Sequence, residues 1–153
     1  MTMPTRREFL LLLAAAASAR HAGAAAPELA VFVNPKLAVS SLSDVELEAI
    51  YLTNRRYWSG SDVIVPFNLP AQSAPRVQFD RAVLRMDPDQ VGRYWLDRRV
   101  RGGAPPPRQA PDPALLVRLV SRVEGAIGYA PVEFVSKDVR VVARIRDRKV
   151  LSP

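Results

Sequence analysis

The sequence predicts an α/β domain in which an open mixed sheet is flanked by helices. The chain has 153 residues, which is enough for one domain, and its 48% hydrophobic and 24% charged residues are typical of a globular protein. Runs rich in β-branched residues alternate along the chain with stretches whose apolar residues have helical spacing. This alternation is the observation that favours α/β over the other fold classes.

The first half of the chain contains two predicted strands and two predicted helices. A buried strand begins at Leu29, where "LAVFV" is followed by Asn-Pro. Ser43 and Glu46 have the spacing of a capping box, which predicts a helix that buries Leu47, Ile50 and Tyr51. After the turn "YWSGSD", the run "VIVPF" predicts a second strand, and "APRVQFDRAVLRM" has the spacing of a second helix.

The second half adds two helices and two strands. Asp87 is the predicted N-cap of a helix with Pro88 in its first turn and Gln90 at its third position. Residues 102–113 form a Pro-rich loop, which we expect to be an extended arm without regular structure. Asp112 and Pro113 then begin a helix whose predicted inward residues are Leu115, Leu116, Leu119, Val120 and Val123.

Two short strands complete the predicted sheet. "EGAIGYAP" predicts a turn and a strand, and "VRVVARIR" predicts the last strand, with Val139, Val141, Ala143 and Ile145 on one face. Its other face carries Arg140, Arg144 and Arg146, and charges in this pattern are typical of a solvated or edge strand.

Residues 1–24 predict a cleaved signal peptide. A basic start at Arg6 and Arg7 is followed by an apolar run that is too short to span a bilayer, and then by small residues up to Ala24. The stretch "TRREFL" resembles the twin-arginine export signal, although Leu11 stands where a lysine is usual, so both export routes remain open. We expect a periplasmic protein of residues 25–153 that forms one domain and does not insert into the membrane.

The composition after cleavage excludes most catalytic chemistry. The net charge falls from +7 to +5, and neither cysteine nor histidine remains. Nucleophilic triads and ordinary zinc or copper sites are therefore excluded, and the carboxylates form no concentrated motif. We expect no enzyme, no catalytic residue, no metal and no cofactor. The arginines form no single stripe, so we expect no nucleic acid and favour acidic surfaces or small anions as partners.

The segment "NLPAQSAPRVQFDR", residues 68–81, joins a predicted strand to a predicted helix. Such a helix N-terminus offers free N–H groups and partial positive charge to an anion. The segment is therefore the candidate binding site of the chain.

Three segments, in chain order, resemble the phosphate-binding-protein family, which are the exported substrate-binding proteins of phosphate ABC transporters. They are "VSSLSDVELEAIYLTNRRYWSGSDVIVPFNLP", "FDRAVLRMDPDQVGRYWLDRRVRGGAPPP" and "EGAIGYAP", and the resemblance runs from Val31 to about Pro131. It implies a periplasmic-binding-protein-like (type II) fold. Members have two lobes with the ligand between them, whereas about 129 residues remain here after cleavage, so the resemblance implies a single lobe.

The family tends to place a Gly-Ser-Gly-Thr loop, with an arginine nearby, where this chain has "NLPAQSAPR". Ser73 and Arg76 match that pattern, but Gln72 precedes the serine, Ala74 and Pro75 follow it, and Pro75 has no N–H to donate. The resemblance thus implies a reduced anion site, for which the candidate residues are Ser73, Arg76, Gln72, Asn68, Ser41 and Tyr129.

Each candidate also has a structural interpretation. Ser73 either binds the anion or caps the following helix, and Arg76 either clamps the anion or is solvated. Ser40 and Ser41 are expected in a turn before the first helix, and Tyr129 in packing. Trp58 and Trp95 are expected in the core or as anchors on the lobe surface, and Gly102 and Gly103 are expected in a hinge of the arm.

Two functions follow from these expectations. The first is a solute-binding protein for phosphate or a similar oxyanion, with an ABC permease as its partner. The second is a ligand-free derivative of that fold, which acts as a periplasmic protein-interaction partner of an envelope complex. The loop from Gln72 to Arg76 distinguishes them, because a complete anion cage there supports the first.

Overall fold

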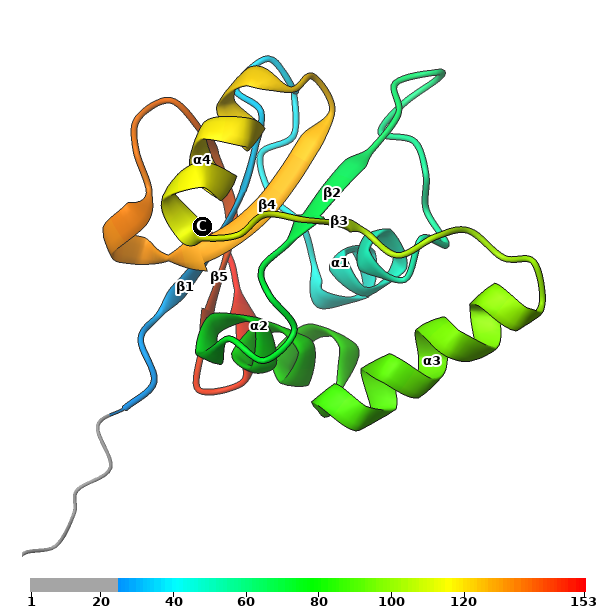
Figure 1. Cartoon of the computed structure of the whole chain (residues 1–153). Coiled ribbons are helices and arrows are strands. Elements are labelled where there is room, and N and C mark those ends of the chain that lie inside the picture. The colour runs from blue at the N-terminus through cyan, green and yellow to red at the C-terminus, as the bar shows by residue number, and fades with distance from the viewer. Residues whose placement is uncertain (1–24) are drawn as a thin grey trace, which may run out of the picture.

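Six strands form one open mixed sheet with the order β3-β2-β4-β1-β5-β6 (Figure 1). The strands are β1 (Leu29–Val33), β2 (Val65–Asn68), β3 (Arg108–Gln109), β4 (Ala126–Pro131), β5 (Arg140–Arg146) and β6 (Lys149–Leu151). β2 is parallel to both β3 and β4, whereas β1 is antiparallel to both of its neighbours, β4 and β5. The computed structural model describes residues 25–153, and the predicted signal peptide lies outside the described residues.

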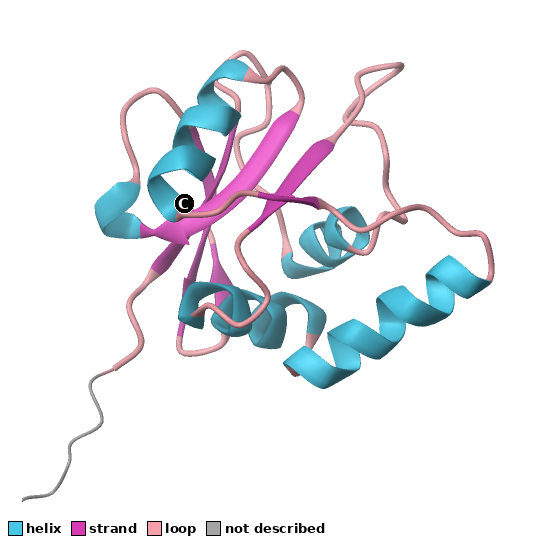
Figure 2. Ribbon diagram, viewed as in Figure 1, coloured by secondary structure: helices cyan, strands magenta, loops and turns pink. Residues whose placement is uncertain are grey.

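Helices alternate with the strands along the chain, which confirms the predicted α/β class (Figure 2). They are α1 (Asp44–Tyr51), α2 (Ala74–Phe79), a π-helix η1 (Asp80–Leu84), α3 (Pro88–Val100), α4 (Pro113–Arg122) and a 3-10 turn η2 (Val132–Phe134). In residues 25–153, no helix has both the length and the apolar character needed to cross a membrane.

The two faces of β4 receive different helices. A Cβ atom on Gly128 would lie 2.3 Å from Cδ2 of Leu116, so the absence of a side chain lets α4 pack directly on the strand. The next residue, Tyr129, points to the opposite face, where its ring packs against Phe79 of α2 and Tyr51 of α1. Figure 1 shows α4 in front of β4.

The predicted helix starts are confirmed by their caps. Ser43 and Glu46 form a complete capping box at α1, and Asp87 and Gln90 form another at α3. Asp112 accepts a hydrogen bond from the backbone N–H of Leu115 at the start of α4. On α4, however, Val117 is buried where the periodicity placed Leu115, which is only half-buried.

The last predicted strand is not an edge strand. β5 lies between β1 and β6, because the chain continues through a hairpin at Asp147 and Arg148. Both hairpin residues have positive φ (48° and 62°), and an Asp-Arg pair lacks the glycine that usually marks such a turn. A register shift in the β1–β5 pairing places Val142 in the core, whereas Val141 is only partly buried.

The Pro-rich segment 102–113 also differs from expectation. Arg108 and Gln109 pair with Phe67 and Asn68 of β2, so this part of the segment has regular structure. Gly102 and Gly103 do not form a free hinge. Their N–H groups donate to carbonyl groups in the last turn of α3, and they thereby end that helix.

Candidate functional site

The candidate loop lies at the carboxyl edge of the parallel strands. The segment 69–73 follows β2 at this edge, and α4 begins a few residues after β3. Ligands of open α/β sheets bind outside the carboxyl ends of the strands. The location predicted from the sequence is therefore one at which this class of fold places its sites.

A hydrogen-bonded group of buried side chains fills the space beneath the loop. We call Asn68, Arg76, Asp80 and Tyr129 the carboxyl-edge cluster; their exposed fractions are 4%, 6%, 3% and 0%. The Tyr129 hydroxyl donates to Asn68 Oδ1 over 3.1 Å and accepts from the backbone N–H of Leu69 over 3.4 Å. Arg76 Nη1 donates to the Leu69 carbonyl over 3.1 Å. The cluster thus holds the start of the loop in place.

The charge of Arg76 is compensated within the protein. Its Nε donates to Asp80 Oδ2 over 2.6 Å, and both side chains are buried. Burial raises the pKa of Asp80, and the neighbouring guanidinium opposes that rise. Asp80 Oδ1 is buried and has no hydrogen-bond partner. Arg76 is therefore not solvated, which corrects that interpretation, and its charge is already paired with a carboxylate within the chain.

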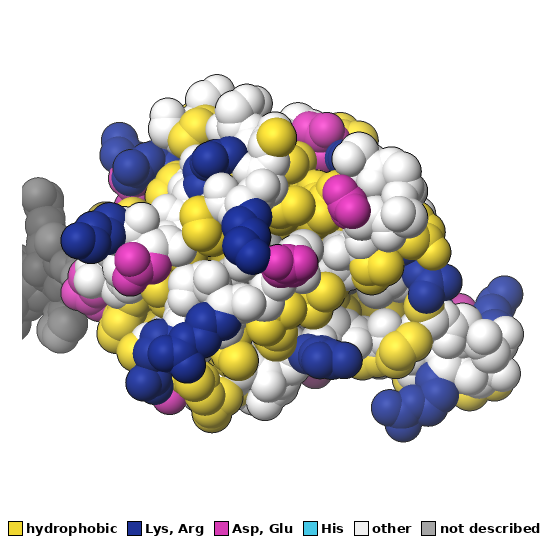
Figure 3. All heavy atoms as spheres, turned by 90° about the horizontal axis from the view of Figure 1, so that it is seen from above, with side chains coloured by type: hydrophobic (Ala, Val, Ile, Leu, Met, Phe, Trp, Pro, Cys, Tyr) yellow, Lys and Arg dark blue, Asp and Glu magenta, His cyan; other side chains and the backbone are white. Residues whose placement is uncertain are grey.

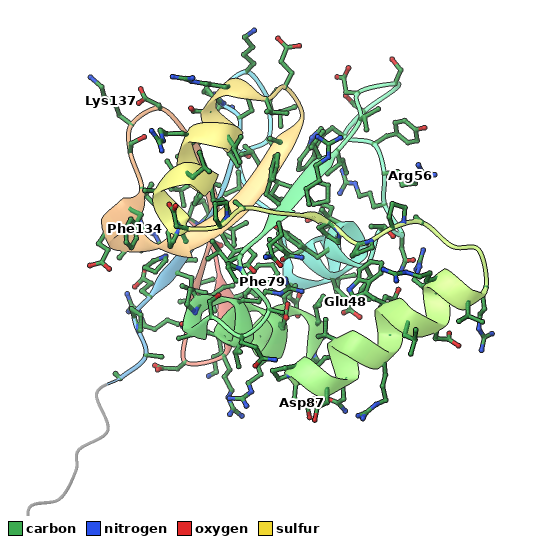
Figure 4. The ribbon with its side chains drawn as sticks, viewed as in Figure 1. Glu48, Arg56, Phe79, Asp87, Phe134 and Lys137 are labelled. Atoms are coloured by element: carbon green, nitrogen blue, oxygen red, sulfur yellow. The ribbon has the colours of Figure 1, made fainter. Side chains whose placement is uncertain are left out.

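Tyr129 has the packing role expected of it. Its ring stacks on Phe79, with 3.8 Å between the centroids and 7° between the planes. Figure 4 shows Phe79 in the interior above α2. Burial raises the pKa of the Tyr129 hydroxyl far above its usual value, so the hydroxyl stays protonated and remains a donor.

The side chains of the remaining candidate residues form no hydrogen bond with the cluster in the described part of the chain. Ser73 occupies the N-cap position of α2, but its hydroxyl donates to the Pro70 carbonyl over 2.7 Å and accepts no helix N–H. The predicted capping hydrogen bond is therefore wrong. Gln72 is exposed in a different pocket, beside Arg81 and Arg148. Ser41 is exposed where α1 begins, in a pocket shared with β6.

Asp80 is not among the predicted site residues, although the chain carries a signal for it. Arg76 and Asp80 are four residues apart in a predicted helix, the spacing at which opposite charges meet. Trp58, by contrast, has the expected core position, since it is nearly buried and its Nε1 donates to the Gly125 carbonyl over 2.9 Å.

The surface charges form no continuous basic stripe on the face seen in Figure 3. Lys and Arg side chains occur there in separate groups, with apolar and neutral atoms between them. Several of the arginines are paired, including Arg144 and Arg146, which both bind Glu28. The positive charge on this face is therefore divided among separate groups.

Comparison with known proteins identifies the class of fold. No protein-family model and no curated protein sequence matches the chain. Among solved structures, it is similar to an ABC-type phosphate transport receptor from Vibrio cholerae, with a TM-score of 0.61 and 20% identity. The match covers 77% of this chain and 47% of that one.

Two other solved structures give the same result. A protein assigned as a phosphate ABC transporter substrate-binding protein of Clostridium perfringens, with bound phosphate, matches with a TM-score of 0.61 and 18% identity, over 77% of this chain and 46% of that one. PstS from Borrelia burgdorferi matches with a TM-score of 0.60 and 14% identity, over 77% and 47%. The chain shares the fold of phosphate-binding proteins and spans about half their length, which confirms the fold that the resemblance implied.

Proposed function

We propose that this chain is an exported solute-binding protein that holds a small, phosphate-like oxyanion at the carboxyl edge of its parallel strands. The shared fold with phosphate receptors supports a solute-binding role. The groups at the carboxyl edge support the location. The guanidinium of Arg76 and the hydroxyl of Ser73 lie in one short segment, and the amide of Asn68 lies at the end of the strand before it. In this proposal the protein is not an enzyme and binds no nucleic acid.

The observation that carries the proposal is the position of Arg76. No hydrogen bond among residues 25–153 uses its Nη2, and none uses Nδ2 of Asn68. Both groups remain available as donors at the edge where this fold binds ligands, and arginine is the usual bidentate partner of an oxyanion. Asp80 then fixes the orientation of the guanidinium while the anion contacts its outer side.

The proposed site is one wall of a complete site. Pro75 supplies no N–H, Ser73 already donates to Pro70, and the chain has about half the length of the two-lobed proteins. We therefore propose that a second protein unit covers the anion, either another copy of the chain or an envelope protein such as an ABC permease. The affinity of the isolated chain should accordingly be modest.

Calorimetric titration with phosphate and sulfate tests this proposal, with chloride as the control anion. Arg76 cannot simply be truncated, because Asp80 would remain buried without its partner. The informative variant is the double substitution Arg76→Met/Asp80→Leu, which removes both charges together. Arg118→Ala is the matched control, because Arg118 is exposed on α4, away from the cluster.

We expect the double variant to lose oxyanion binding while it remains folded, and Arg118→Ala to bind as the unchanged protein does. Ser73→Ala should weaken binding less than the double variant, because its hydroxyl must first leave the Pro70 carbonyl. If the double variant binds phosphate as well as the unchanged protein, the carboxyl edge is not the site.

A second function is favoured by the same geometry. The Ser73 hydroxyl and one side of the Arg76 guanidinium already have partners within the chain, as expected of a fold that has lost its ligand. Such a chain would act as a periplasmic protein-interaction partner of an envelope complex. Complete absence of oxyanion binding by the folded, unchanged protein would decide for this alternative.

A further inference from the structure

An apolar pocket lies between the end of α1, the start of β2 and the Pro-rich segment. Its volume is about 310 Å³, at the lower end of the range for small-molecule sites. We call it the arm pocket. The C-terminal end of α1, residues 63–66 and the segment 104–108 line it, and its apolar lining residues are Ile50, Val63, Ile64, Val65, Pro66, Ala104, Pro105, Pro106 and Pro107. It shares no residue with the carboxyl-edge cluster.

Arginines also line this apolar pocket, and they differ in what they bind. Arg55 is engaged, since it donates to Glu46 and to the carbonyl groups of Tyr57 and Trp58. Arg56 and Arg108 are exposed, and neither forms an ion pair with any residue in the part of the chain that the structure describes. Figure 4 shows Arg56 on the loop that joins α1 to β2. The arm pocket therefore combines an apolar interior with uncompensated positive charge.

The backbone around the pocket argues against an added peptide strand. The N–H of Val65 donates towards β4, to Gly125, and the N–H of Ile64 donates to the Arg56 carbonyl on the other edge. Pro66 is the next residue whose N–H position faces this second edge, away from β4, and proline has no N–H. A peptide could not form a regular ladder with this edge, so the geometry favours a small molecule that fills the pocket.

Thr53 also lines the pocket, but its hydroxyl is not offered to a ligand. Its side-chain oxygen Oγ1 is buried and has no hydrogen-bond partner. The wall thus offers the two exposed guanidinium groups of Arg56 and Arg108, and no lining carboxylate opposes them.

We propose that the arm pocket binds a small organic carboxylate with an apolar body. The apolar part fills the space between β2 and the prolines, and the carboxylate faces Arg56 and Arg108. Apolar pockets with a few convergent polar groups have this selectivity, and arginine pairs with carboxylates in a bidentate geometry. This site is independent of the proposed oxyanion site, so each can be present without the other.

Binding of hexanoate, measured by the chemical shifts of backbone amides, tests the proposal, with 1-hexanol as the neutral analogue. We expect shifts confined to residues 50–66 and 104–108, with a Kd on the order of 1 mM for so small a ligand. Hexanol should bind at least about tenfold more weakly, because it lacks the charge that the arginines recognise.

Two sets of variants locate the site. Arg56→Ala/Arg108→Ala should weaken hexanoate binding by about tenfold or more and leave hexanol unchanged. The control Arg93→Ala/Arg118→Ala removes the same charge from exposed sites elsewhere and should have no effect. Ala104→Phe, which fills the pocket, should abolish binding of both ligands.

The proposal is overturned if hexanoate produces no shifts at these residues, or if hexanol binds as tightly as hexanoate. It is also overturned if the two arginine double variants weaken hexanoate binding equally, since that outcome indicates a general effect of net charge. Each variant's folding is checked from its own amide spectrum, so that a lost site is distinguished from a lost fold.

Discussion

The carboxyl-edge cluster and the arm pocket both contain arginine, but the surroundings of the arginines differ. Arg76 is buried and paired with a buried carboxylate, whereas Arg56 and Arg108 are exposed and pair with no carboxylate among residues 25–153. A buried charge needs a partner, because its desolvation is otherwise too costly, while an exposed charge is stabilised by water. Similarity to a binding motif can therefore identify a location without showing that the charge there is available to a ligand.

Truncation of Arg76 should give the largest effect on stability. Arg76→Ala leaves Asp80 buried without its cation, which should lower the free energy of unfolding by about 3 to 5 kcal/mol. Arg76→Met/Asp80→Leu should recover most of that loss, since both charges are then absent. Urea unfolding of the three proteins measures both effects, and a loss below about 1 kcal/mol for Arg76→Ala would show that the ion pair is not structurally important.

The hydroxyl of Tyr129 should give the next largest effect. Tyr129→Phe keeps the stacking on Phe79 but leaves Asn68 Oδ1 and the N–H of Leu69 without this partner. We expect a loss of about 1 to 3 kcal/mol by the same unfolding measurement. A variant as stable as the unchanged protein would mean that water replaces the hydroxyl, and that the loop is more accessible than the cluster suggests.

The pH dependence of stability should report the burial of Asp80. Because burial raises the pKa of Asp80 in the folded protein, the folded state binds the proton more tightly than the unfolded state does. The stabilisation that protonated Asp80 contributes is therefore fully present below the unfolded pKa of about 3.9. It is lost as the pH rises through the raised pKa of the folded state. In Asp80→Asn, stability should fall less across this window. An identical pH profile for the two proteins would show that Asp80 does not titrate there.

Removal of the two arm-pocket arginines should give the smallest effect. Arg56→Ala/Arg108→Ala removes exposed side chains that have no ion pair in the described part of the chain, so the free energy of unfolding should change by no more than about 0.5 kcal/mol. Thermal unfolding beside Arg118→Ala provides the comparison. A loss as large as that of Arg76→Ala would remove the distinction between the two regions.

The fold could be predicted because its signals are local. The capping boxes at Ser43 and Asp87 mark two helix starts, and a β-branched apolar run marks β1. The missed elements lack such signals: the hairpin before β6 has Asp147 and Arg148 at positive φ, and β3 is only two residues long and depends on its pairing with β2. Their formation is decided by tertiary contacts, which periodicity does not contain.

The site was predicted less completely, for a physical reason. The strand-to-helix position of residues 68–76 identifies the carboxyl edge, and the structure brings Asn68, Arg76 and Tyr129 together there. Ser41 and Gln72 were included by resemblance, and the structure places them in two separate pockets that the cluster residues do not line. Whether the Arg76 guanidinium is exposed to solvent or paired with a carboxylate depends on Asp80, one helical turn later. It also depends on the residues that bury both side chains, which sequence spacing alone does not establish.

The most direct test of the account is to find where an oxyanion contacts the protein. Phosphate is titrated into the isotopically labelled protein, and the shifts of the backbone amides are followed. The account predicts saturable shifts at residues 69–76 and at the start of α4, which are absent in the folded Arg76→Met/Asp80→Leu variant. Shifts confined to the arm pocket, or saturable shifts unchanged in that variant, would contradict the claim that the carboxyl edge binds the anion.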